Sequence, residues 1–399
     1  MDPSELWERL HVDEVDADEL RSVLALDHDL ARYDGEGEVS YFAEGRHQLT
    51  LRYSTKGALQ AVEPGPDFDQ VHFDKVESRV ETALLTDQGV RIFRAIAFST
   101  VRVDGFFRYQ DRFQVLPAPE GAPRSEAVMG QHAFVIEVAY DHSSESTIAG
   151  SRRLAAARDV NLLLAALVYL VDERLSVQQR QVWAVPIGEG GGPIWSSELY
   201  WIKGFENLRE NFSTPDVPAL ERRPTELYYD ETGIREDAKV RLPEDVEVML
   251  DRAYALDAGR RGRLFRWCFW LNHASLVWNL SRSATYMAVI QSVEALRPDA
   301  SGGPPCKECG KFTGDGPTAQ FARFMDEYVP TQDGEAEGER RRLYRLRSAL
   351  THGGMVLQMD QPQAFGGLDP KFFAERANAG LASKLARLAG VYWLLRKGE

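Results

Sequence analysis

Two periodicities of apolar residues divide this chain. Between about residues 39 and 140, segments such as "HQLTLRYST" and "HAFVIEVAY" alternate apolar and polar positions or are rich in β-branched and aromatic residues. Turn-forming stretches such as "EPGPD" and "TDQG" separate them. A period of two with Gly and Pro at the breaks predicts strands. From about residue 245 to residue 399, apolar residues recur every three or four positions, which predicts helices.

Helical patterns also occur within the N-terminal part. Residues 3–32 and the segment "SRRLAAARDVNLLLAALVYLVDERL", residues 151–175, both have helical spacing of apolar residues. We therefore predict an α+β chain. A mixed, strand-rich module occupies residues 1–240, and an all-α helical bundle occupies residues 241–399.

Charge follows the same boundary. The 399 residues carry a formal net charge of −14. Residues 241–399 hold 22 basic and 19 acidic residues, a net charge of +3, whereas residues 1–240 hold 25 and 42, a net charge of −17. An acidic module joined to a mildly basic one is a two-module signal. The bulk charge weighs against non-specific binding to duplex DNA, but it leaves room for a small basic cleft.

Composition narrows the setting of the protein. The longest apolar run, residues 160–171, is too short to cross a bilayer, so we expect no membrane association. The opening "MDPSELWERLHVDEVD" is acidic and lacks the apolar core of a signal peptide. Three cysteines are too few for a disulfide framework. These features together favour a cytoplasmic protein.

The segment "RRRLYRLRSALTHGG", residues 340–354, holds the first candidate chemistry. Leu343, Leu346 and Leu350 form one apolar stripe of a predicted helix, with Tyr344 and Thr351 on the same side. Arg347 lies at the edge of this stripe, so its side chain is expected in a partly covered groove. The glycines at 353 and 354 are typical of a helix C-terminus, and ending the helix there lets the imidazole of His352 swing back towards Arg347.

A histidine and an arginine in one groove suit the cleavage of RNA without metal. The imidazole of His352 can exchange a proton with the 2′-hydroxyl or the leaving oxygen near neutral pH. The guanidinium of Arg347 can hold the phosphate and stabilise its growing charge. The plainer interpretation, favoured on spacing alone, is that Arg347 forms a salt bridge within the bundle and His352 simply ends a helix, because this spacing is common by chance.

A carboxylate on a second predicted helix changes this balance. In "ATYMAVIQSVEAL", residues 284–296, Glu294 lies at the edge of the apolar face, beside Met287 and Ile290. A half-buried carboxylate needs a partner, and an arginine of a neighbouring helix, Arg347, is the obvious one. Such a pair would fix the guanidinium in place. The alternative, an exposed helical glutamate, stays open.

The ordered segments "YMAVIQSVEAL", "CKECGK" and "LYRLRSALTHGG" resemble the HEPN (higher eukaryotes and prokaryotes nucleotide-binding) superfamily, in particular its ApeA-like branch, over residues 260–399. The resemblance implies a helical bundle that dimerises with two Arg-x4-6-His motifs facing each other. It also implies a metal-independent endoribonuclease that leaves a cyclic phosphate, as in bacterial toxin–antitoxin or anti-phage systems. Some members only bind or scaffold, which is the alternative function here. Ser348 departs from the usual Asn or Asp after the arginine.

Roles follow for particular residues. His352 is the expected proton-transfer residue, Arg347 the phosphate clamp, and Glu294 the residue that orients Arg347. We expect RNA, with transfer RNA one candidate, to contact Arg340, Tyr344, Ser348 and Thr351. Arg341 and Arg345 are expected simply to face solvent.

The sequence says less about cofactors and protein partners than about the RNA site. No cofactor is expected for catalysis. Cys306 and Cys309 have the C-x2-C spacing of half a structural zinc site, and a metal-free loop is the plainer interpretation. The acidic module, residues 1–240, is expected to sense a protein trigger or to restrain the nuclease.

Overall fold

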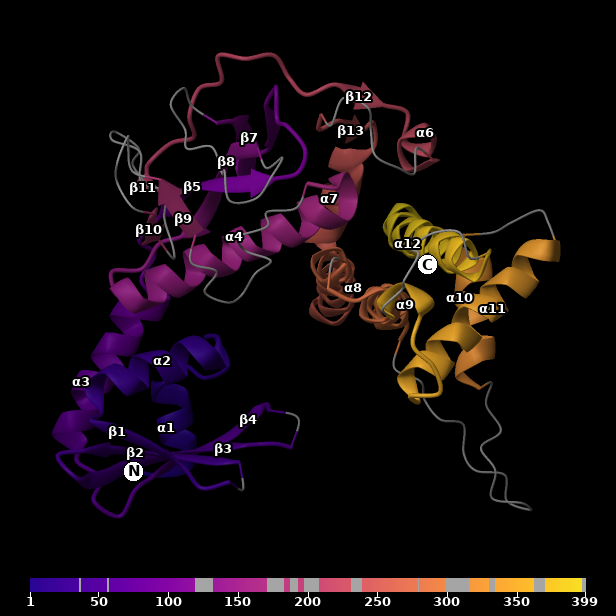
Figure 1. The fold of residues 1–399 in the computed structure, drawn as a ribbon. Coiled ribbons are helices and arrows are strands. Elements are labelled where there is room, and N and C mark those ends of the chain that lie inside the picture. The colour runs from indigo at the N-terminus through magenta and orange to yellow at the C-terminus, as the bar shows by residue number, and fades with distance from the viewer. Residues whose placement is uncertain are drawn as a thin grey trace, which may run out of the picture. The chain divides into compact units, whose positions relative to one another are not determined.

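The computed structural model of the protein describes residues 1–35, 37–55, 57–118, 132–170, 183–186, 193–196, 208–230, 239–278, 280–298, 316–329, 334–361 and 370–396. Its strands lie towards the N-terminus and its C-terminal part is helical, as Figure 1 shows. The predicted α+β class is confirmed. The chain divides into two compact units. One comprises Met1–Phe93, Val138–Ala157 and Leu208–Asn211; the other comprises Arg94–Glu137, Arg158–Asn207 and Phe212–Glu399.

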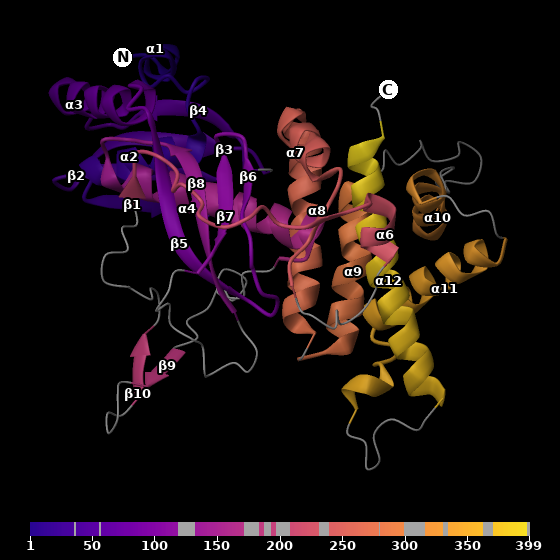
Figure 2. The same ribbon diagram turned by 90° about the horizontal axis from the view of Figure 1, so that it is seen from above.

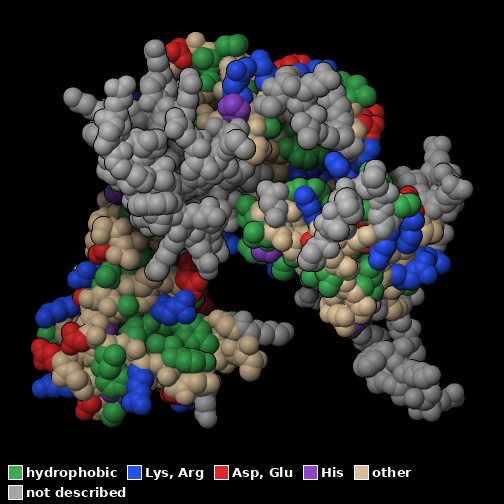
Figure 3. Space-filling model, viewed as in Figure 1, with side chains coloured by type: hydrophobic (Ala, Val, Ile, Leu, Met, Phe, Trp, Pro, Cys, Tyr) green, Lys and Arg blue, Asp and Glu red, His purple; other side chains and the backbone are tan. Residues whose placement is uncertain are grey.

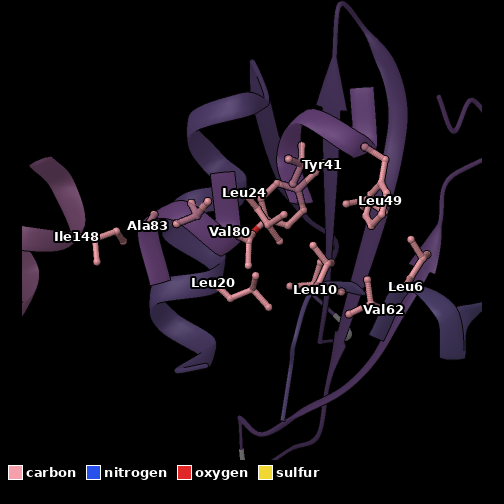
Figure 4. Close-up of a cluster of buried hydrophobic side chains, with 14 residues drawn as sticks. Leu6, Leu10, Leu20, Leu24, Tyr41, Leu49, Val62, Val80, Ala83 and Ile148 are labelled. Carbon is pink, nitrogen blue, oxygen red and sulfur yellow. The ribbon is translucent and has the colours of Figure 1, made fainter. Parts of the chain in front are cut away.

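The first unit packs helices against a four-stranded antiparallel sheet. The sheet has the order β1 (Leu30–Tyr33), β2 (Glu38–Ala43), β3 (Arg46–Tyr53) and β4 (Leu59–Pro64). Its helices are α1 (Pro3–Arg9), α2 (Ala17–Asp27) and α3 (Gln70–Val80), which runs into a π-helical turn at Glu81–Leu85. The core shown in Figure 4 joins side chains from these helices to the buried face of the sheet, including Leu10, Leu24, Tyr41, Leu49 and Val62.

The helical prediction over residues 3–32 is confirmed for two separate helices, α1 and α2, and is wrong at residues 30–32. Helix α1 ends at Arg9, and α2 starts afresh behind Asp16, whose side chain accepts hydrogen bonds from the amides of Asp18 and Glu19. Residues 30–33 form strand β1. An aspartate that caps a helix in this way satisfies amides that have no partner within the helix, so the chain can break and restart at little cost.

The second sheet has five strands. Their order is β11 (Leu208–Arg209), β5 (Val90–Ser99), β8 (His132–Asp141), β7 (Phe113–Pro117) and β6 (Phe107–Tyr109). Two smaller pairs are the antiparallel β9 (Trp183–Pro186) with β10 (Pro193–Ser196) and the parallel β12 (Arg222–Arg223) with β13 (Leu242–Pro243). Helix α4 (Ser146–Val168) begins before the predicted residue 151 and ends at Val168; α6 (Thr225–Asp230) is short.

The C-terminal helices pack on one another, as Figures 1 and 2 show. They are α7 (Val246–Ala255), α8 (Ala258–Val277), α9 (Arg282–Leu296), α10 (Pro317–Tyr328), α11 (Gly334–Thr351) and α12 (Pro370–Leu395). Helices α8 and α12 approach closely where the Trp267 indole donates to the Ala386 carbonyl at 3.0 Å. A Cβ on Gly390 would lie 2.1 Å from that ring, so only glycine fits there. Within the described residues, no helix combines the length and the apolarity that crossing a membrane needs.

The division into two compact units does not test the boundary predicted at residue 240 or the roles predicted for the two parts. The separation of an acidic module over residues 1–240 from a bundle over residues 241–399 stays a prediction.

Candidate functional site

The candidate site lies where α11 packs against α9. Helix α9 begins behind Ser281, whose hydroxyl accepts a hydrogen bond from the amide of Ala284. The Tyr286 hydroxyl donates to the Leu343 carbonyl of α11 at 2.8 Å, which ties the two helices together. This hydrogen bond sets Glu294, two turns further along α9, beside the second half of α11.

The ion pair expected between the two helices is present. Arg347 Nη2 donates to Glu294 Oε2 at 2.8 Å. The two side chains retain 22% and 15% of their exposure, so both are half-buried. At this depth the pair is screened less than a surface pair, and each charge depends on the other. The pairing is confirmed, whereas its role in catalysis stays a prediction.

Tyr344 completes this cluster. Its hydroxyl donates to Glu294 Oε1 at 2.7 Å, so the carboxylate uses one oxygen for Tyr344 and the other for Arg347. The Tyr344 ring packs on Phe321 of α10, with centroids 4.9 Å apart. Burial, and then the hydrogen bond to Glu294, raise the pKa of Tyr344 to about 12. With only 4% of its surface exposed, Tyr344 acts inside the protein and not as the expected RNA contact.

The C-terminus of α11 has the geometry of a Schellman motif. The amide of His352 donates to the Ser348 carbonyl at 3.1 Å, that of Gly353 to Leu350 at 3.2 Å, and that of Gly354 to Ala349 at 2.9 Å. Gly353 has a φ of +69°. This bond pattern with a left-handed glycine ends helices without leaving carbonyls unsatisfied. The glycine cap predicted from the sequence is confirmed.

The position of His352 differs from the expectation. Its amide still bonds four residues back, so its backbone follows the helix and the chain turns only at Gly353. Five residues at about 100° each place His352 about 140° from Arg347 around the helix. The imidazole is exposed, and within the described residues no hydrogen bond joins it to Arg347. In one chain, the two side chains therefore occupy different faces of α11.

Two smaller side chains lie between them on the helix surface. Thr351 is exposed, and its hydroxyl donates to the Arg347 carbonyl at 2.9 Å. Ser348 is half-buried. Both residues keep part of their surface exposed near the end of α11.

Arg340 does not present its guanidinium to a ligand, contrary to the expectation from the sequence. Its side chain is only 2% exposed, forms an ion pair with Asp326 and donates to the Val329 carbonyl at the end of α10. A buried guanidinium held by a carboxylate and a helix-end carbonyl is a structural group. Helix periodicity contained the signal, because Arg340 shares the covered face of Tyr344 and Arg347 at i+4 and i+7.

A second carboxylate, not anticipated from the sequence, holds the chain that follows the glycines. Asp360 accepts from the Ser281 hydroxyl at 2.8 Å and from the amides of Arg282 and Ser283 at 2.5 and 2.7 Å. The Leu357 amide donates to the Ser283 hydroxyl at 2.9 Å. The segment after His352 is thus attached to the N-terminus of α9, where a carboxylate is also favoured by the helix dipole.

The structural zinc site predicted from the sequence cannot be located in the structure. Cys306 and Cys309 lie outside the described residues. Across the described ranges, no group of three or more His, Cys, Asp or Glu side chains is arranged to hold a metal ion.

Comparisons of the chain with protein-family models, with curated proteins and with solved structures found no match.

Proposed function

We propose that the protein is a metal-independent endoribonuclease of the HEPN type, cytoplasmic and acting in a bacterial toxin or anti-phage system. The observation that carries the proposal is the Tyr344–Glu294–Arg347 cluster, together with an exposed histidine on another face of α11 at the end of the same helix. The carboxylate orients the guanidinium, and the exposed imidazole of His352 is the proposed proton-transfer group.

The proposed reaction starts from the 2′-hydroxyl of RNA. His352 takes its proton as the oxygen attacks the adjacent phosphorus, and a protonated imidazole gives a proton to the departing 5′-oxygen. The products are a 2′,3′-cyclic phosphate and a 5′-hydroxyl. Arg347 stabilises the charge on the non-bridging phosphate oxygens. No metal ion takes part.

The separation of the two side chains makes a second copy part of the proposal. Because Arg347 and His352 lie about 140° apart on one helix, one phosphate reaches both most readily between two copies of α11. We propose a homodimer through the helical bundle in which the two motifs face each other. The acidic module, residues 1–240, is proposed to receive a protein trigger or to restrain cleavage.

The same separation favours a second candidate, a non-catalytic scaffold. In one chain Arg347 is already paired with Glu294, and His352 faces elsewhere. If no dimer brings the motifs together, α9 and α11 form a structural helix pair and the bundle serves only binding.

Incubation of the full chain with transfer RNA and with total RNA, in excess chelator, separates the candidates. We expect cleavage that chelator does not affect. His352→Ala should lower it by about 100-fold or more, as removal of a general acid–base does, and Arg347→Ala by a similar factor because it removes charge stabilisation at the phosphate. Arg342→Ala is the matched control, since Arg342 is exposed on the same helix and hydrogen-bonded to Asn378. Intact RNA beside a stable dimer supports the scaffold instead.

A further inference from the structure

One exposed face of α11 gathers residues able to bind phosphate. Arg341, Arg345, Ser348 and His352 stand at i, i+4, i+7 and i+11, which places them within about 60° of one another around the helix. Arg341, Arg345 and His352 are exposed, and Ser348 is half-buried. We call these four residues the basic face of α11. Figure 3 shows Lys and Arg side chains gathered over this part of the bundle.

This face is distinct from the one that carries the Glu294 pair. Arg340 forms an ion pair with Asp326, and Arg347 forms one with Glu294. Arg345 has no ion pair or hydrogen bond to another described residue, so its guanidinium keeps its donors for a ligand, whereas Arg341 is exposed but already has a partner. A rise of 1.5 Å per residue spaces Arg341 about 6 Å from Arg345, and His352 about 10 Å beyond it. Groups this far apart contact successive positions of an extended chain and not one ion.

We propose that the basic face of α11 binds the backbone of single-stranded RNA, with Arg345 and Arg341 on phosphates adjacent to the one at His352. The inference rests on the proposed function for its substrate. It replaces the expectation that Arg340 binds RNA and that Arg341 and Arg345 only face solvent. Arginine suits this role because its planar fork matches phosphate oxygens in a bidentate way. The Ser348 hydroxyl, between the two arginines and the histidine, is placed to donate to the same strand.

Charge favours RNA as the occupant over a protein surface. The chain has a formal net charge of −14, so most of its surface repels a polyanion. A local row of arginines is therefore the place where an RNA strand can bind. These arginines lie on the same helix as His352, the residue proposed to take part in RNA cleavage. An acidic protein partner is the other occupant, and it is the one that remains if the basic face fails to bind RNA.

The test measures how RNA binding depends on salt. The probe is a single-stranded oligonucleotide carrying 2′-O-methyl groups, which lacks the attacking hydroxyl and so reports binding without cleavage. For each phosphate that a variant no longer neutralises, the slope of log Kobs against log salt should fall by about 0.7. We expect Arg345→Gln and Arg341→Gln each to lower the slope by this amount and to weaken binding several-fold at low salt. Arg342→Gln should leave the slope unchanged, because Arg342 lies off this face and is engaged with Asn378.

The outcomes separate this inference from the proposed function. Slopes unchanged in both variants, or no binding by the unaltered chain, overturn the basic face as an RNA site, even where RNA cleavage is observed. Slopes lowered as expected support it, even where natural RNA stays intact and the nuclease proposal fails.

Discussion

Three arginines of α11 lie in three different environments. Arg340 is buried against Asp326, Arg347 is half-buried against Glu294, and Arg345 is exposed. Helix phase decides among them, because steps of three or four residues stay on one face. The Glu294–Arg347 pair was predictable, since both charges border apolar stripes. Helix phase also places Arg340 on the covered face, but its partner Asp326 was not predictable, because it belongs to α10, whose orientation no local pattern specifies.

Tyr344 offers a test at the residue scale. Tyr344→Phe keeps the ring against Phe321 and removes the hydrogen bond to Glu294, so the free energy of unfolding should fall by about 1–2 kcal/mol at pH 8. The folded pKa of Tyr344, about 12, lies above an unfolded value near 10, so this stabilisation is complete below pH 10. It is lost as pH rises towards 12. Urea unfolding at pH 8 and pH 11 measures both; a gap between Tyr and Phe that widens with pH contradicts the assignment.

Gly353 gives a second residue-scale test. At a φ of +69°, alanine is strained, so Gly353→Ala should lower the free energy of unfolding by about 1 kcal/mol. Its neighbour provides the control: a Cβ on Gly354 meets only the Ala349 carbonyl, at an ordinary 3.5 Å, and Gly354→Ala should be close to neutral. Equal destabilisation in the two variants would show that backbone strain is not the cause. Because Gly353 follows His352, the first substitution should also lower any RNA cleavage.

At the scale of elements, the ends of helices were harder to predict than their existence. The pattern of residues 284–296 lies within α9 (Arg282–Leu296), and Ser281 is a local cap of a familiar kind. The second cap, Asp360, comes from 78 residues further along the chain than Arg282 and left no local signal. Over residues 3–32 the apolar spacing indicated helix but not where it ends: the chain starts a second helix after Asp16 and continues into strand β1.

Asp360 supplies a prediction for this element. Burial alone raises its pKa, but hydrogen bonds from Ser283, Arg282 and Ser281 outweigh burial and hold the pKa below the usual range. A lowered folded pKa means that stability is present above the unfolded pKa, about 3.9, and is lost as pH falls below it. Asp360→Asn should therefore cost about 1 kcal/mol at pH 7 and less at pH 3. Denaturant unfolding at the two pH values measures this; a pH-independent difference would contradict the linkage.

At the scale of the whole molecule, the hydrogen bonds at the C-terminus of helix α4 are expected to contribute most to stability. Residues of α4 belong to both compact units. Within the second unit, the buried Arg387 of α12 donates to the Ala165 carbonyl at 2.8 Å and lies 3.7 Å from the Tyr169 ring centroid. The Tyr229 hydroxyl donates to Leu167 at 2.7 Å. A cation at the carbonyl end of a helix is favourable. The sequence pattern could not reveal this, since 222 residues separate Arg387 from Ala165.

Arg387→Gln should therefore be strongly destabilising. It removes a charged hydrogen bond from buried carbonyls, which is expected to cost about 2–3 kcal/mol. Lys384→Gln is the control on the same helix, because its ion pair with Asp230 is largely exposed and should be worth less than about 1 kcal/mol. Thermal unfolding of both variants compares them. A destabilisation at Lys384 as large as that at Arg387 would contradict the role assigned to the end of α4.

The chemistry of the RNA ends tests the central claim most directly. The full chain is incubated with transfer RNA in excess chelator, and the fragments are analysed for their terminal groups. Attack by the 2′-hydroxyl with proton transfer by His352 predicts 2′,3′-cyclic phosphate and 5′-hydroxyl ends, absent from the His352→Ala reaction. Fragments with 5′-phosphate ends, cleavage that chelator abolishes, or unchanged cleavage by His352→Ala would contradict the account.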